Sequence, residues 1–118
     1  MAGRAVALTC VGAAVIVLAL SLAAVAGGRT NVTVLRGTVG PGFTITLTKK
    51  PTKAGKYALV VSDKSSIHNF HLTGPGVNVK TSVAATGSKT FRITLKKGKY
   101  SFVCDPHAST MHGTFRIR

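Results

Sequence analysis

Apolar and polar residues alternate strictly in two short segments of the chain, 43–47 (FTITL) and 91–95 (FRITL). A period of two gives a strand one apolar and one polar face, which suits a sheet that covers a core on one side. After residue 30, other short β-branched and aromatic runs are separated by Gly, Pro, Asn, Asp and Ser, without a sustained helical period. The pattern predicts an all-β fold, a small antiparallel β-sandwich.

Turn-forming residues divide this region into eight expected strands. The turn signal Lys96-Lys97-Gly98-Lys99 predicts that the strands on either side of it pair antiparallel. About 85 residues suffice for a modest single core without disulfides. The expected strands are Val32–Gly37, Phe43–Thr48, Tyr57–Ser62, Ile67–Leu72, Val77–Ser82, Lys89–Leu95, Tyr100–Cys104 and Gly113–Ile117.

The first quarter of the chain has the layout of a targeting segment. A basic start, Met1–Arg4, precedes the uncharged stretch Ala5–Ala26, which closes on the small-residue pattern Ala24-Val25-Ala26. This layout predicts a secretory signal peptide, but the stretch also reaches the ~20 apolar residues that span a bilayer. Both a cleaved signal and an uncleaved membrane anchor are therefore kept for residues 1–26. In either case residues 27–118 form the folded domain and lie outside the cytoplasm, secreted or periplasmic.

The chain has two cysteines, and cleavage after Ala26 would leave Cys104 as the single thiol. One thiol allows no internal disulfide. In an oxidising compartment a lone thiol is at risk unless it is buried or held by a metal. Because Asp105, Pro106 and His107 follow it as a loop sequence, a metal ligand is a stronger interpretation than a structural core cysteine.

The charge balance is strongly basic, with a formal net charge of +14 and only two carboxylates, Asp63 and Asp105. Two acids cannot form a carboxylate-rich metal cage and make acid–base hydrolysis a weak hypothesis. Such a charge favours polyanions, acidic proteins or anionic membrane surfaces. The lysines form two clusters: Lys49, Lys50, Lys53 and Lys56, and Lys96, Lys97 and Lys99. Each cluster is either a docking surface for an acidic redox partner or a set of solvated turn residues, and the sequence does not distinguish these two interpretations.

One compact group of metal-ligand types follows the expected strand Tyr100–Cys104. Cys104, His107 and Met111 supply a thiolate, an imidazole and a thioether within eight residues. Two His, one Cys and a weak axial Met are the ligands of a blue-copper site, because soft sulfur donors suit Cu(I) and imidazole suits both oxidation states. Pro106 restricts its own φ and the conformation before it, which lets the loop turn back to one centre.

A second imidazole must come from upstream, where His68 and His71 are the candidates. In an extended segment these two side chains point to opposite faces, so they are not expected to serve one mononuclear site together. We favour His68, because Asn69 follows it and Phe70 on the same side suits a core position. His71 is expected to be a partly exposed strand residue. His112, next to Met111, is expected at the surface.

These residues resemble those of the cupredoxins, the small blue-copper proteins that include plastocyanin, amicyanin, pseudoazurin and azurin. Cys-x-x-His resembles the plastocyanin, amicyanin and pseudoazurin pattern, and His-x-x-x-Met the azurin spacing. The combined spacing lies between these subfamilies, which makes Met111 the least secure ligand. The resemblance implies a Greek-key β-sandwich with one type 1 copper. It implies equatorial ligation by His68, Cys104 and His107, axial ligation by Met111, and a second-sphere role for Asn69, which ties the two ligand loops together.

The expected function is therefore extracytoplasmic transfer of single electrons by Cu(I)/Cu(II) cycling, through transient contact with a redox partner that is acidic at its docking face. We do not expect an enzyme, because the chain has too few His for a second copper site, or nucleic-acid binding, because it has no RNA-binding aromatic motif. A monomer is expected, although no feature of the sequence reports the oligomeric state. One alternative is a copper carrier or delivery protein without electron transfer. Another is a copper-free basic β-domain that binds polyanions.

Overall fold

The computed structural model describes residues 3, 12, 14 and 31–118, so the expected targeting segment 1–26 lies almost wholly outside the described residues. In the described part, no helix has the length and apolar character needed to cross a membrane. Residues 31–118 contain eight strands and one short 3-10 helix: β1 (Thr33–Val39), β2 (Ile45–Thr48), β3 (Gly55–Asp63), β4 (His71–Gly74), β5 (Val77–Lys80), β6 (Gly87–Leu95), β7 (Gly98–Val103), η1 (Asp105–His107) and β8 (His112–Ile117).

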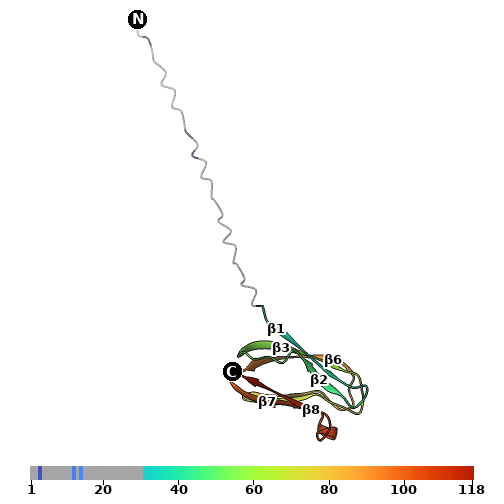
Figure 1. Ribbon diagram of the computed structural model, residues 1–118. Coiled ribbons are helices and arrows are strands. Elements are labelled where there is room, and N and C mark those ends of the chain that lie inside the picture. The colour runs from blue at the N-terminus through green and yellow to red at the C-terminus, as the bar shows by residue number, and fades with distance from the viewer. Residues whose placement is uncertain (1–2, 4–11, 13, 15–30) are drawn as a thin grey trace.

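The strands form two four-stranded sheets that face each other, as Figure 1 shows. One sheet has the order β2-β1-β3-β6 and the other the order β5-β4-β7-β8. Apolar side chains from both sheets are buried between them, among them Leu59 of β3, Leu72 of β4 and Tyr100 of β7. The alternating burial of these strands is what the period-two sequence pattern predicted. The all-β sandwich is confirmed.

Two features of the pairing differ from the expectation. The strands around Lys96 and Lys97 do not pair, because β6 belongs to one sheet and β7 to the other. The Tyr100 hydroxyl accepts from the Lys96 backbone N–H at 2.9 Å and donates to the Pro75 carbonyl at 2.8 Å, which fixes this turn as a corner between sheets. In addition, β1 and β3 pair parallel, so the first sheet is mixed. A short turn signal does not distinguish a hairpin from a corner.

Strand boundaries also differ where they affect the candidate site. β4 begins at His71, so the expected strand Ile67–Leu72 is a loop over most of its length. β2 begins at Ile45, which leaves Phe43 in the β1–β2 loop. The strands that precede these loops, β1 and β3, run parallel and end side by side, since Val39 of β1 is paired with Asp63 of β3.

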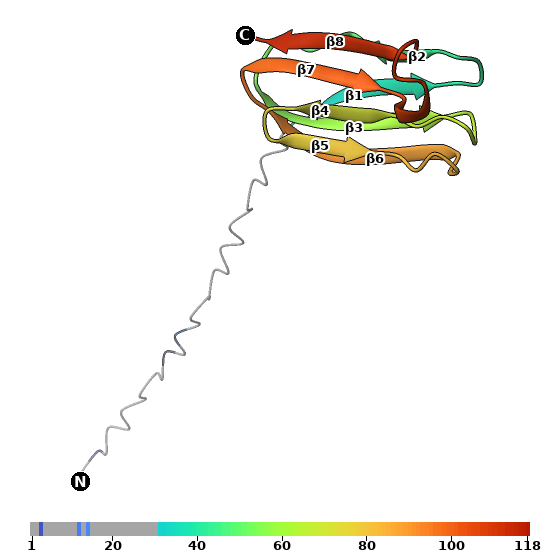
Figure 2. The same cartoon turned by 90° about the horizontal axis from the view of Figure 1, so that it is seen from below.

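The connections β1–β2, β3–β4, β5–β6 and β7–β8 gather at one end of the sandwich, which we call the loop end (Figure 2). Residues 40–44, 64–70, 81–86 and 104–111 form it. β1 begins at the opposite end, where the β2–β3 connection, the Leu95–Gly98 turn and Arg118 also lie. The two ends have different chemistry, and the candidate ligands are all at the loop end.

Candidate metal centre

Three predicted ligands meet at the loop end, although the chain separates them widely. His68 comes from the β3–β4 loop, Cys104 follows β7, and His107 ends η1. The two Nδ1 atoms of the histidines are 3.0 Å apart. The Cys104 Sγ is 3.7 Å from the His68 Nδ1 and 3.6 Å from the His107 Nδ1. His68 and Cys104 are fully buried, and His107 is half-buried.

These three donor atoms form a triangle whose size suits a metal ion. A circle through atoms with these three separations has a radius of about 2.0 Å, close to the ~2.0–2.3 Å at which a metal such as zinc holds imidazole nitrogen and thiolate sulfur. Two neutral imidazoles whose Nδ1 atoms face each other can share only one proton, whereas a cation accepts lone pairs from both. The residues present therefore fit a single metal ion with N₂S equatorial donors.

Backbone hydrogen bonds shape the loop that carries Cys104 and His107. The His107 N–H donates to the Cys104 carbonyl at 3.0 Å, and the Met111 N–H donates to the His107 carbonyl at 2.8 Å. The Cys104 N–H donates to the Met111 carbonyl at 3.0 Å, which closes the loop at its base. Pro106 lies in the first turn of η1, where its missing N–H has no intrahelical role. The loop thus brings Cys104, His107 and Met111 back to the same end of the core.

Asn69 joins the two loops that carry the donors. Its side-chain Nδ2 donates to the Asp105 carboxylate at 2.8 Å, and its Oδ1 accepts from the Asp105 backbone N–H at 2.8 Å. Its backbone N–H lies 3.4 Å from the Cys104 Sγ and points to it as a donor. A donor to sulfur stabilises the thiolate and tunes a metal bound to it. The residue is 2 % exposed, so these contacts are made largely out of water.

His71 lies beside the centre without entering it. Its Nδ1 donates to Asp105 Oδ1 at 2.8 Å, and its Nε2 lies 2.7 Å from Asn78 Oδ1. Burial raises the pKa of Asp105, but hydrogen bonds from Asn69 and His71 and the charges of His71 and Lys80 outweigh this, so its pKa lies below the ordinary value. The Asp105 carboxylate is therefore ionised and is held from two sides.

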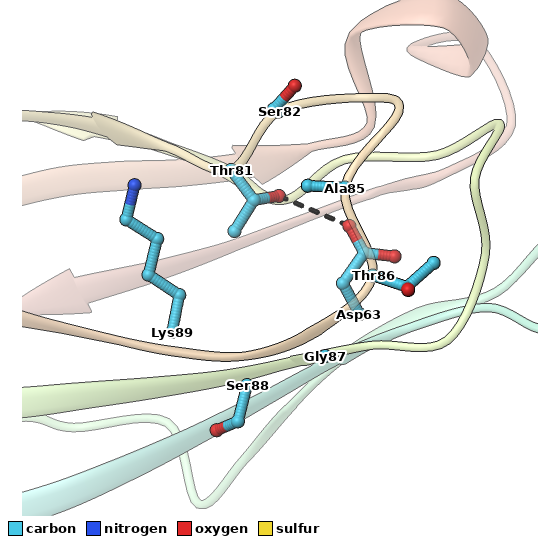
Figure 3. A pocket seen from close by; sticks show the side chains of 8 residues that line it. All are labelled: Asp63, Thr81, Ser82, Ala85, Thr86, Gly87, Ser88 and Lys89. Carbon is cyan, nitrogen blue, oxygen red and sulfur yellow. Dashed lines mark hydrogen bonds between the residues drawn. The ribbon is translucent and has the colours of Figure 1, made fainter.

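A buried polar network supports the segment next to His68. The Thr81 hydroxyl accepts from the Phe70 N–H at 2.8 Å. It donates to Asp63 Oδ2 at 3.4 Å, the contact drawn in Figure 3. The Asp63 Oδ1 accepts from the Ser65 N–H at 3.1 Å. Asp63 and Thr81 also line a pocket of about 180 Å³ with residues of the β5–β6 loop and the start of β6. This network fixes the backbone on both sides of the His68–Asn69 pair.

The remaining predicted residues divide between core and surface. Met111 is 1 % exposed and belongs to the hydrophobic core. Its role as axial ligand stays a prediction. Pro106 is exposed at the loop end, and His112 is exposed at the start of β8, as expected.

The sequence from residue 24 to residue 118 matches the model of a family described as copper binding proteins, plastocyanin/azurin family. The chain belongs to this family. The match spans both donor loops and every strand of the sandwich. No curated protein matches the chain significantly.

Solved structures of other cupredoxins share the fold. Two structures of reduced rusticyanin are 20 % identical, with TM-scores of 0.53 and 0.55; they match over 72 % of this chain and 76 % and 78 % of theirs. Dithionite-reduced auracyanin from the photosynthetic bacterium Roseiflexus castenholzii is 17 % identical, with a TM-score of 0.52, over 73 % of this chain and 97 % of its own. At these identities the likeness shows the fold, and the family match adds the metal: the N₂S centre fits one type 1 copper.

The surroundings of this cupredoxin centre include one aromatic residue that the sequence analysis did not place there. The Phe43 ring lies edge-on to both imidazoles, with centroid distances of 5.1 Å to His68 and 5.0 Å to His107. Phe43 is 62 % exposed, and Ile67, next to His68, is 52 % exposed. The strict alternation 43–47 indicated a core-facing strand position for Phe43. The β1–β2 loop instead places the Phe43 ring over the centre, a position that no local sequence pattern predicts.

Proposed function

We propose that this cupredoxin carries single electrons outside the cytoplasm, with His68, Cys104 and His107 as equatorial ligands of one copper ion and Met111 as the axial ligand. The observation that carries the proposal is the triangle of two Nδ1 atoms and one Sγ with separations of 3.0, 3.6 and 3.7 Å. Copper supplies a one-electron change between Cu(I) and Cu(II), and this donor set suits both states.

The protein's own part in this function is to hold the donors still. Cys104 is fixed by the end of β7 and by the closing bond from Met111, and Asn69 links its loop to that of His68. A centre whose ligands do not move needs little rearrangement when its charge changes by one. The buried His68 and Cys104 also keep water from two of the three donors. These features favour electron transfer over a delivery role, which needs an open site.

We propose that the redox partner docks at the loop end, where Phe43 and Ile67 form the exposed apolar surface nearest the centre. Among the described residues, the lysines at this end are Lys64, Lys80 and Lys89, which can steer a partner with an acidic docking face. By strand register, Lys49 lies level with the middle of β3. Lys53, Lys56 and the cluster 96–99 lie toward the other end, about 30 Å away for a nine-residue strand such as β3. A partner bound only there would be too distant for fast electron tunnelling.

The proposal is tested by voltammetry of the copper-loaded protein in the presence of a strong Cu(I) chelator. We expect a reversible one-electron wave that keeps its amplitude over many cycles, since the buried donors hold the metal in both states. Loss of copper to the chelator on the first reduction would instead support a copper delivery protein. No specific copper binding would revive the copper-free polyanion-binding hypothesis.

A further inference from the structure

The two ends of the sandwich differ strongly in charge. At the end where β1 begins, seven exposed cationic side chains gather without any carboxylate side chain of the described residues, and we call this surface the basic end. At the loop end, three lysines are offset by the two acids of the chain, Asp63 and Asp105. The residues of the basic end are Lys53, Lys56, Lys96, Lys97, Lys99, Arg116 and Arg118.

Strand register places these side chains together. Gly55 of β3 pairs with Leu95 of β6, so the segments that carry Lys56 and Lys96 are neighbours. In the other sheet, Lys99 of β7 is opposite Arg116 of β8. The Arg118 N–H donates to the Thr52 carbonyl at 3.0 Å, which joins the two sheets at this end. The cations therefore surround this end of the sandwich, with members on both sheets.

The chain enters the fold through this same surface. Thr33, the first residue of β1, lines a pocket with Lys49 and Lys53. Val32, just before it, lines another with Lys56. Only the six residues 27–32 separate Thr33, the start of β1, from the apolar stretch Ala5–Ala26, and six extended residues reach at most about 20 Å.

We propose that the basic end binds a membrane surface that contains anionic lipid, with Ala5–Ala26 as the anchor, so that the copper end faces away from the bilayer. The short linker holds the basic end close to any membrane that contains the apolar stretch, and a cluster of cations near an anionic surface is attracted to it. This assigns the basic end to a lipid surface rather than to a redox partner, and it goes beyond electron transfer.

Screening makes the two ends independent. The ends are about 30 Å apart along β3. The Debye length is about 8–10 Å at physiological to 0.1 M salt. An anionic surface that touches the basic end therefore exerts little attraction on Lys64, Lys80 and Lys89. The difference in charge orients the domain instead of drawing all of it onto the membrane.

The reactivity of individual lysines measures which end of the domain faces the membrane. The full chain is reconstituted in vesicles of phosphatidylcholine alone or with phosphatidylglycerol, and lysine acetylation by a water-soluble reagent is followed residue by residue by mass spectrometry. On the anionic vesicles we expect Lys53, Lys56, Lys96 and Lys97 to react several-fold more slowly than on neutral ones. Lys64 and Lys80 should keep the same rates, and high salt should abolish the difference.

Two matched triple variants separate charge from tethering. Lys96→Glu/Lys97→Glu/Lys99→Glu should remove the protection of Lys53 and Lys56. Lys64→Glu/Lys80→Glu/Lys89→Glu, with the same change in net charge at the loop end, should leave it intact. Equal protection of Lys53 and Lys56 from acetylation on neutral vesicles would mean that tethering alone acts. Equal protection of the lysines at both ends, or of neither, would leave the basic end as a surface for an acidic protein. Each of these results overturns the proposal. None of these measurements depends on bound copper, so they are independent of the voltammetry.

Discussion

The Nδ1 atoms of His68 and His107 lie 3.0 Å apart and face each other, although 39 positions separate the two residues in the chain. Neither atom can be satisfied fully by the other without a shared proton or a cation. His68 lies in the β3–β4 loop and His107 in the β7–β8 connection. Contacts between these two loops therefore set the geometry of the metal centre. Asn69 is the residue that joins them most directly.

Replacing Asn69 by Ala should lower the stability of the metal-free protein by about 2–3 kcal/mol, because the buried Thr81 carbonyl and the backbone N–H and carboxylate of Asp105 all lose a hydrogen bond. Urea unfolding followed by circular dichroism measures this change. Asn31→Ala, at an exposed position, should change stability by less than about 0.5 kcal/mol. Equal effects of the two substitutions would show that Asn69 does not tie the loops.

Removing the Phe43 ring should open the centre without unfolding the protein. Phe43 lies over both imidazole edges but is 62 % exposed, so Phe43→Ala should cost less than about 1 kcal/mol of stability. We expect copper to pass to a competing chelator several-fold faster than from the wild type, measured by the chelator's absorbance. Val34→Ala removes a similarly exposed apolar side chain from β1 and should leave the rate unchanged. Identical rates for all three proteins would contradict the shielding role.

Asp105 should make a small, acid-sensitive contribution to stability. Because its pKa is lower in the folded protein than the usual ~3.9 of an unfolded chain, this contribution is present above about pH 4 and is lost as the pH falls through the folded value. The carboxylate is 42 % exposed, so solvent screening limits the gain to less than about 1 kcal/mol. The measurement compares unfolding of the metal-free wild type and Asp105→Asn from pH 6 to pH 3.

The stability difference between these two proteins should shrink toward acid pH. A difference that stays constant or grows as the pH falls would mean that the ionised carboxylate does not stabilise the fold.

The sequence was sufficient for the parts of the site that are local in the chain. Cys104, Pro106 and His107 lie in one loop after a strand, and their spacing alone predicted that the loop returns to one centre. The choice of His68 over His71 was predicted from Asn69, and the structure brings His68 to the other donors while His71 hydrogen-bonds Asp105.

What the sequence did not reveal depends on contacts between distant segments. The contact between His71 and Asp105 requires the pairing of His71 with Val103, a register that no single segment encodes. The position of Phe43 depends on how the β1–β2 loop folds over another loop. Similarly, the turn at Lys96–Lys97 has the residues of a hairpin, and only the partners of β6 and β7 decide that it is a corner.

The most direct test of the metal centre is the visible absorption spectrum of the protein with one equivalent of Cu(II), recorded for the wild type and for Cys104→Ser. We predict an intense thiolate-to-copper charge-transfer band in the wild type, bleached by ascorbate and absent from the Ser variant. A pale wild-type complex, or the same spectrum from both proteins, would contradict a blue-copper centre built on Cys104.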